Sequence, residues 1–124
     1  IDADDLAAVA ESLQSEYLTT GPTVGLFEKK FAATVGARYA VASNSGTAAL
    51  HLACMGLDLG PGDSVVVPAV TFMATANAAR YCGAEVIFAD VDPDSGLLTA
   101  ETFEAALDAH PRAAVRAVRK NIMS

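Results

Sequence analysis

The stretch AVASNSGTAAL (residues 40–50) contains the transition that decides the fold. Its first residues continue an apolar run that begins at Tyr39, small polar residues follow, and a helix-like segment begins at Gly46 or Thr47. A strand that turns directly into a helix is the unit from which α/β domains are built. If this stretch is such a unit, the sequence that follows it should repeat the alternation.

Short apolar runs do alternate with helix-like segments along most of the sequence. The runs predict three strands, at Tyr39–Ala42, Ser64–Val67 and Glu85–Asp90. A helix-like segment follows each run, at Gly46–Met55, Thr71–Tyr81 and Ala100–Ala109, and Ala113–Val118 is a candidate fourth strand. Strands that alternate with helices are joined by right-handed crossovers, which produce parallel sheets covered on both faces. The predicted fold class is α/β, with a mainly parallel sheet flanked by helices.

Two helices are expected before the first strand. Apolar residues at three- and four-residue spacing in Asp2–Glu16 predict an amphipathic helix. A second helix is predicted at about Gly25–Val35, with Gly36 as its C-terminal cap. The Gly-Pro pair within Tyr17–Val24 predicts a loop between them.

The composition limits the class of protein. Of 124 residues, 52% are hydrophobic and 19% are charged, which excludes a disordered chain and suits one domain. No uncharged apolar run approaches the roughly 20 residues of a membrane span, and no secretory signal is visible. Cys54 and Cys82 form no CxxC pair, so we expect small, buried thiols of a reduced, cytoplasmic protein.

Acidic residues dominate the charge. The net charge is −7, and residues 1–108 contain all 15 acidic residues. Binding of nucleic acid through its phosphates requires clustered lysine and arginine. Nucleic acid is therefore not an expected partner.

The polar turn within residues 40–50, the bend between Ala42 and Ala48, has the chemistry of an anion site. A helix that starts directly after a strand directs free backbone N–H groups and the positive end of its dipole at one point. Ser43, Ser45 and Thr47 add hydroxyl donors, and Gly46 leaves room for close approach. The alternative is that Ser45 only caps the helix. Because the sequence shows neither GxGxxG after the first strand nor GxxxxGK[ST], the phosphate would not belong to a dinucleotide or a nucleoside triphosphate.

Three motifs in order resemble one protein family. They are NSGTAAL (residues 44–50), VPAVTFMATANAA (Val67–Ala79) and YCGAEVIFADVDP (Tyr81–Pro93), preceded by YLTTGPTVGLFEKKFAATVGARYAVA. Together they resemble the pyridoxal-phosphate-dependent sugar aminotransferases of the DegT/StrS type, from about Asp2 to Val118. The subgroup that aminates UDP-linked 4-keto-6-deoxy-N-acetylhexosamines is the most similar.

The resemblance implies a fold and a set of site residues. Residues 1–118 would be the N-terminal part of the large domain of a fold-type I transferase, and residues 119–124 an atypical tail. The phosphate of pyridoxal 5'-phosphate would lie on Ser45, Gly46, Thr47 and Ala48, and its ring on Phe72. A loop containing Glu16, Tyr17, Leu18 and Thr19 would lie near the sugar. For Phe72 alone, a core aromatic residue at a helix start is the competing interpretation.

The resemblance also implies what this sequence lacks. The family's Schiff-base lysine and the aspartate that pairs with the pyridine nitrogen lie further along than this sequence extends. Neither Lys29 and Lys30 on the second helix nor Lys120 is placed to substitute. No catalytic residue or metal ligand is therefore assigned, and this chain alone is expected to be inactive.

The whole protein would transfer an amino group, usually from glutamate, to a nucleotide-linked keto sugar. The family implies a cytoplasmic homodimer that makes aminosugars for cell-surface polysaccharide, with no membrane partner. The alternative is an inactive fragment, or a noncatalytic module that binds a phosphate-bearing ligand or a protein through open sheet edges. A calcium loop at Asp90–Glu101 is disfavoured because Pro93 and a glycine at position 7 break the pattern.

Overall fold

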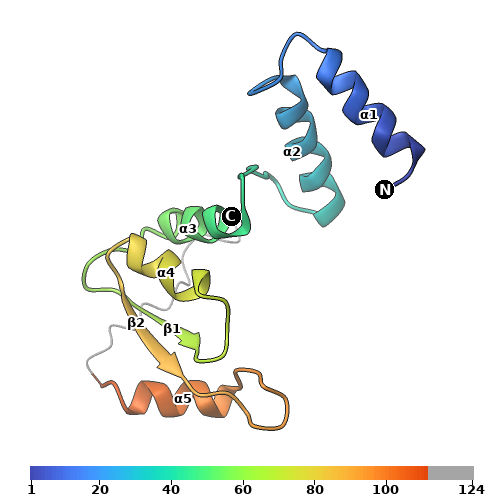
Figure 1. Cartoon of the computed structure of the whole chain (residues 1–124). Helices are drawn as coiled ribbons and strands as arrows, with labels where there is room; N and C mark the ends of the chain where they lie inside the picture. Colours follow the sequence, from blue (N-terminus) through green and yellow to red (C-terminus); the bar gives the residue numbers. More distant parts are fainter. Residues whose placement is uncertain (112–124) are drawn as a thin grey trace. The chain divides into compact units, whose positions relative to one another are not determined.

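The computed structural model describes residues 1–111, which fall into two units, Ile1–Ala42 and a second that begins at Ser43. Figure 1 shows the elements of each unit. The candidate strand Ala113–Val118 and the tail at residues 119–124 lie outside the described residues. Within residues 1–111, no helix has the length and apolar character needed to cross a membrane.

The first unit contains two helices whose ends the sequence encodes. Helix α1 (Ala3–Gln14) begins at a capping box, in which the Asp2 side chain accepts the amides of Asp4 and Asp5. Helix α2 (Pro22–Val35) ends at Gly36, which has the left-handed φ of 68° expected of a C-terminal cap.

The predicted loop Tyr17–Val24 is too long, since α2 already begins at Pro22. Proline is favoured at the first helical position because its φ is already helical and its missing N–H would have no partner there. The Gly-Pro pair marks a helix start here rather than the middle of a loop.

The predicted strand Tyr39–Ala42 is wrong for the described residues, where this segment belongs to no sheet. Its residues nevertheless alternate as in a strand: Tyr39 and Val41 are 75% and 77% exposed, whereas Ala40 and Ala42 are half-buried. A strand requires a neighbouring strand to complete its hydrogen bonds. The local pattern is therefore that of an extended segment without such a neighbour among residues 1–111.

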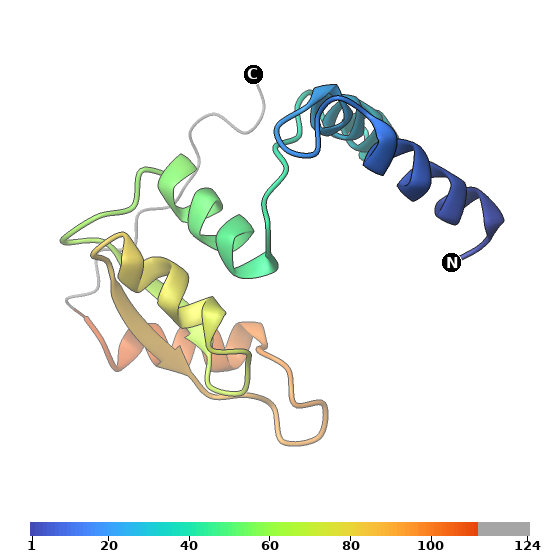
Figure 2. The same cartoon turned by 45° about the horizontal axis from the view of Figure 1, so that its top comes forward.

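The second unit is a small α/β layer structure. Strands β1 (Ser64–Pro68) and β2 (Glu85–Ala89) pair in parallel, with Ser64 opposite Glu85 and Pro68 opposite Ala89. Figures 1 and 2 show helix α4 on one face of this sheet and helix α5 on the other. The helices of this unit are α3 (Gly46–Gly56), α4 (Ala74–Tyr81) and α5 (Ala100–Asp108).

The core of the second unit lies between β2 and α5. Ile87 and Ala89 of β2 pack with Ala106 of α5, and the partly buried Val66 of β1 joins them. On the other face, the buried alanines of α4 include Ala79, which is fully inaccessible. Small residues allow the helices to approach the sheet closely, which fixes the ends of β1 and β2 and the helix starts beside them.

Candidate functional site

The polar turn ends where helix α3 begins, at the first of the two expected positions. Ser45 is the N-cap, with extended φ and ψ of −162° and 159°, and its hydroxyl accepts the Ala48 amide at 3.1 Å. The Ser43 hydroxyl donates to the Ser45 carbonyl at 3.1 Å, which closes the turn from the other side. Ser45 therefore caps the helix. An anion site at this turn also requires backbone amides that donate to no other acceptor.

Two amides at the borders of the turn are engaged. The Ala42 amide donates to the Glu28 carboxylate at 2.8 Å, and the Ala48 amide donates to the cap. Between them, the backbone amides of Ser43–Thr47 donate to no acceptor within the part of the chain that the structure describes. The anion seat is thus narrower than residues 42–48, but five consecutive amides remain for an oxyanion. We call Ser43–Thr47 the amide turn.

Nothing among the described residues requires glycine at position 46. A Cβ atom added there would meet none of their atoms within 4 Å, and the φ of Gly46 is not in the left-handed range. Glycine at a helix start costs stability relative to a residue with a side chain. Close approach of a ligand to the amide turn provides a reason that packing and backbone geometry do not.

Phe72 lies between β1 and α4, where its carbonyl accepts the Thr75 amide at 2.9 Å. Its side chain is 73% exposed, which is inconsistent with a core aromatic residue in this unit. Helix α4 begins at Ala74 rather than at the predicted Thr71, so Phe72 precedes the helix. An exposed ring at this position is available to stack on a flat ligand.

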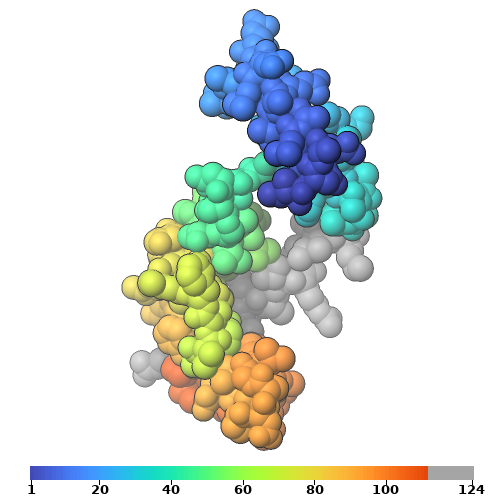
Figure 3. All heavy atoms as spheres, turned by 45° about the vertical axis from the view of Figure 1, so that its right-hand side comes forward, coloured from blue at the N-terminus to red at the C-terminus, as the bar shows by residue number. Residues whose placement is uncertain are grey.

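The helices that follow the amide turn and Phe72 begin at the same end of the second unit. Figures 1 and 2 agree that α3 and α4 begin at the end where β1 and β2 finish, and Figure 3 shows their atoms packed side by side. Ligands of parallel α/β sheets bind at this carboxyl end, beside the helix starts. The two parts of the predicted cofactor site therefore share the appropriate edge.

The predicted substrate residues belong to the first unit. Glu16, Tyr17, Leu18 and Thr19 link α1 to α2 and are exposed, and the Ser15 hydroxyl donates to the Tyr17 carbonyl at 3.0 Å. Because this link and the amide turn are in different units, their relation to each other stays a prediction.

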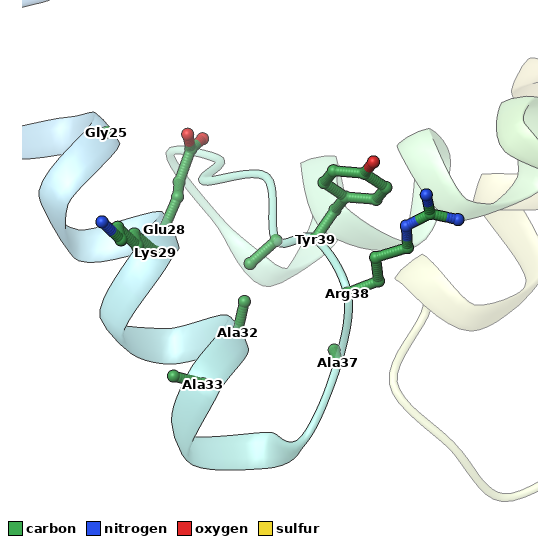
Figure 4. Close-up of a pocket in the computed structure, with 9 residues that line it drawn as sticks. Gly25, Glu28, Lys29, Ala32, Ala33, Ala37, Arg38 and Tyr39 are labelled. Carbon is green, nitrogen blue, oxygen red and sulfur yellow. The ribbon is translucent and has the colours of Figure 1, made fainter.

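A pocket of about 400 Å³ lies in the first unit, between α2 and the segment that follows it. Figure 4 shows small alanine side chains together with Glu28, Lys29, Arg38 and Tyr39 around it. The Arg38 guanidinium lies 5.3 Å from the centre of the Tyr39 ring. None of the predicted site residues lines this pocket, and its residues match no chemistry that the sequence suggested.

Sequence reasoning missed Glu28, which holds the residue directly before the amide turn. The partners are 14 positions apart, so no local motif joins them.

The calcium-like segment is a self-contained turn. Asp92 accepts the Ser95 hydroxyl at 2.7 Å and the Ser95 amide at 2.8 Å. The hydroxyl and the amide of Ser95 hold the pKa of the Asp92 carboxyl below its ordinary value. Among residues 1–111, no group of three or more potential ligand residues could hold a metal ion.

The two cysteines are half-buried rather than fully buried, and both are free thiols. Burial, and to a smaller extent the neighbouring Cys82, raises the pKa of the Cys54 thiol. His51 is also half-buried, with its ring in an edge contact with Tyr81 at 5.3 Å.

Residues 1–119 match the profile of the DegT/DnrJ/EryC1/StrS aminotransferase family. The chain is 44% identical over 115 residues to the spore coat polysaccharide biosynthesis protein SpsC of Bacillus subtilis (strain 168), covering 93% of this chain and 30% of that protein.

Two solved structures are similar in fold. The putative sugar aminotransferase Spr1654 from Streptococcus pneumoniae, in its PLP-form, gives a TM-score of 0.78 at 32% identity, over 86% of this chain and 27% of that one. A DegT DnrJ EryC1 StrS aminotransferase from Brucella abortus gives 0.72 at 41% identity, over 84% and 28%. The chain thus spans about 30% of the length of its relatives. The predicted fold class, part of the large domain of a fold-type I transferase, is confirmed.

Proposed function

The chain belongs to the DegT/DnrJ/EryC1/StrS aminotransferase family, and we propose that its protein transfers an amino group from glutamate to a nucleotide-linked keto sugar. The cofactor is pyridoxal 5'-phosphate. The observation that carries the proposal is the amide turn at the start of α3, whose five consecutive amides donate to no acceptor within residues 1–111. A phosphate is the group that such a helix start binds best.

The residues present fit the cofactor. Ser45, Gly46 and Thr47 would hold its phosphate through the amides of the turn, and Ser45 and Gly46 are exposed. Ala48, the fourth residue that the resemblance implies, has its amide engaged by the Ser45 hydroxyl at 3.1 Å. Phe72 provides an exposed apolar ring for stacking, two residues before α4 begins. When bound, pyridoxal phosphate supplies a conjugated ring that accepts electrons from the reacting carbon. This chain binds and orients the ring, and the lysine and aspartate implied by the resemblance come from the remainder of the protein.

The loop Glu16–Thr19 contacts the sugar substrate. Its carboxylate and hydroxyls are acceptors and donors suited to sugar hydroxyls, and all four residues are exposed. We assign the substrate to the UDP-linked 4-keto-6-deoxy-N-acetylhexosamines. The similarity to a spore coat polysaccharide biosynthesis protein supports a product destined for cell-surface polysaccharide. The active protein is a homodimer in the cytoplasm.

A noncatalytic binding module is the second candidate, and open sheet edges favour it. In the described chain the sheet has two strands, so each has one edge that pairs with no other strand. Such edges recruit other strands. Family membership over residues 1–119 favours the enzyme, because the remaining strands of the family's sheet would then cover these edges.

The test uses the full-length protein. Pyridoxal phosphate added to it should give a visible absorption band that borohydride reduction fixes to the protein, and inorganic phosphate should compete with its binding. Glutamate together with a UDP-linked keto sugar should then yield 2-oxoglutarate and an amino sugar. A protein that takes up neither pyridoxal phosphate nor inorganic phosphate would contradict the enzyme and any module that binds a phosphate-bearing ligand, and would support a module that binds a protein.

A further inference from the structure

Two hydrogen bonds close the segment of the chain that contains Phe72. The Phe72 carbonyl accepts the Thr75 amide at 2.9 Å, and the hydroxyls of Thr71 and Thr75 are hydrogen-bonded to each other at 3.0 Å. The segment lies wholly within the second unit, after β1 ends at Pro68 and where α4 begins. Thr75 therefore restrains Phe72 once through its backbone and once, by way of Thr71, through its side chain.

The Thr75 hydroxyl does not serve as a helix cap. The N-cap of α4 is Met73, which has helical φ and ψ of −52° and −31° and makes no side-chain capping bond. A threonine inside a helix can bond a carbonyl of the preceding turn, as the Thr34 hydroxyl does with the Lys30 carbonyl in α2 at 2.9 Å. The Thr75 hydroxyl instead pairs with the hydroxyl of Thr71, which precedes the helix. It therefore joins α4 to the segment before it.

An exposed ring depends on its backbone for a fixed direction. The Phe72 side chain is 73% exposed, so packing among the described residues covers only a minor part of it. Stacking requires one face of the ring to meet the face of the ligand. A ring whose backbone is already fixed loses less conformational entropy when a ligand stacks on it. The contacts made by Thr75 supply this restraint, because they join the residues on either side of Phe72.

We propose that Thr75 is a positioning residue for the cofactor ring, because its hydrogen bonds to Thr71 and Phe72 hold the segment that presents the Phe72 side chain. This inference rests on the proposed function, since that function assigns the pyridine ring of pyridoxal phosphate to Phe72. It predicts that the Thr75 hydroxyl affects binding of a ligand that contains the ring, and not of inorganic phosphate.

The experiment measures the affinity of the full-length protein for pyridoxal phosphate and for inorganic phosphate. Thr75→Val keeps the β-branched shape but removes the hydroxyl. It should weaken pyridoxal phosphate by about two- to fivefold, the upper figure being the loss expected when the stacking ring itself is removed. Binding of inorganic phosphate should not change. Thr75→Ser keeps the hydroxyl and should recover most of the affinity for pyridoxal phosphate.

Two further variants examine the path from Thr75 to the ring. Thr71→Val removes the partner hydroxyl and should weaken pyridoxal phosphate as Thr75→Val does. In a protein that already contains Phe72→Ala, Thr75→Val should cause no further loss, because the ring that it positions is gone. Thr34→Val is the matched control, since it removes a threonine hydroxyl bonded within α2, and it should change neither affinity.

The outcomes separate this proposal from the function on which it rests. If Thr75→Val weakens both ligands equally or changes neither, the positioning role is overturned while the cofactor assignment stands. A full additional loss in the Phe72→Ala protein, or no recovery with Thr75→Ser, also overturns it. A Phe72→Ala protein that binds pyridoxal phosphate as tightly as the wild type removes the ring from the site, and the role of Thr75 with it. A wild-type protein that binds no pyridoxal phosphate overturns the proposed function itself.

Discussion

Replacing Ser45 by aspartate separates helix capping from anion binding. Serine and aspartate are about equally good N-caps, so the carboxylate can accept the Ala48 amide as the Ser45 hydroxyl does at 3.1 Å. A negative charge at a helix start also gains about 0.3–1 kcal/mol from the dipole. If Ser45 only caps α3, Ser45→Asp should leave the protein unchanged or slightly more stable.

The same substitution should oppose a phosphate bound at the amide turn. Two unit charges about 4 Å apart repel by about 1 kcal/mol in water and about 4 kcal/mol near a protein surface. Ser45 and Gly46 are exposed in the described chain, so the lower figure gives the minimum repulsion. A phosphate ester carries nearly two negative charges, which gives a loss of about 2 kcal/mol, or about 30-fold in affinity.

The assay is a titration of the full-length protein with pyridoxal phosphate, alongside thermal unfolding without the cofactor. Thr99→Asp is the matched control, because the Thr99 hydroxyl caps α5 by accepting the Thr102 amide at 3.3 Å, on the other face of the sheet. It should leave the affinity unchanged. If Ser45→Asp binds pyridoxal phosphate as tightly as the wild type, the amide turn does not hold the phosphate and the reasoning is refuted.

Three further outcomes follow from the geometry. Phe72→Ala should weaken pyridoxal phosphate by about fivefold, the effect of about 1 kcal/mol of stacking, with little change in the unfolding temperature because the ring is 73% exposed; a large loss of stability would instead indicate a packing role. Gly36→Ala should destabilise the protein by about 1 kcal/mol because φ is 68° there. Gly25→Ala is the control, because it lies inside α2 and its Cβ would meet none of the described atoms within 4 Å. Denaturant unfolding should show a loss of stability for Gly36→Ala alone. Burial raises the pKa of the Cys54 thiol above its ordinary value of 9.0. The protonated thiol therefore contributes its full stability below pH 9.0, and this contribution is lost as the pH rises through the raised pKa. In that pH range the free energy of unfolding of the wild type should fall more steeply than that of Cys54→Ala, and parallel curves of stability against pH would contradict this.

Local signals predicted some helix ends. Gly36 caps the end of α2 and Ser45 caps the start of α3, as expected, whereas α2 and α4 begin at Pro22 and Ala74 rather than at the expected positions. Caps depend on residues within one turn of each other, so one sequence contains all the information that they need. The amide turn was predictable for the same reason.

The incorrect predictions concern residues whose hydrogen-bond partner is far away in the sequence. Tyr39–Ala42 has the alternation of a strand, but strand formation depends on a neighbour that local pattern does not supply. The Ala42 amide belonged to the predicted seat, yet Glu28 takes it from 14 positions away. Both errors concern one segment, because its hydrogen bonds are non-local.

The exposure of the amide turn and Phe72 affects how tightly they can bind pyridoxal phosphate. Water competes for amide donors and screens the helix dipole, so an exposed helix start holds a phosphate more weakly than a covered one. The amide turn and Phe72 are both open to solvent in the described chain. These residues would bind pyridoxal phosphate more tightly if the remainder of the family's fold covered the amide turn and Phe72 and excluded water. We therefore expect the full-length protein to bind pyridoxal phosphate much more tightly than residues 1–124 do, with the same dependence on Ser45 and Phe72 in both. If the full-length protein and residues 1–124 bind pyridoxal phosphate equally tightly, the amide turn does not need to be covered in order to bind. If the affinity depends on Ser45 in neither of the two, the amide turn is not part of the site.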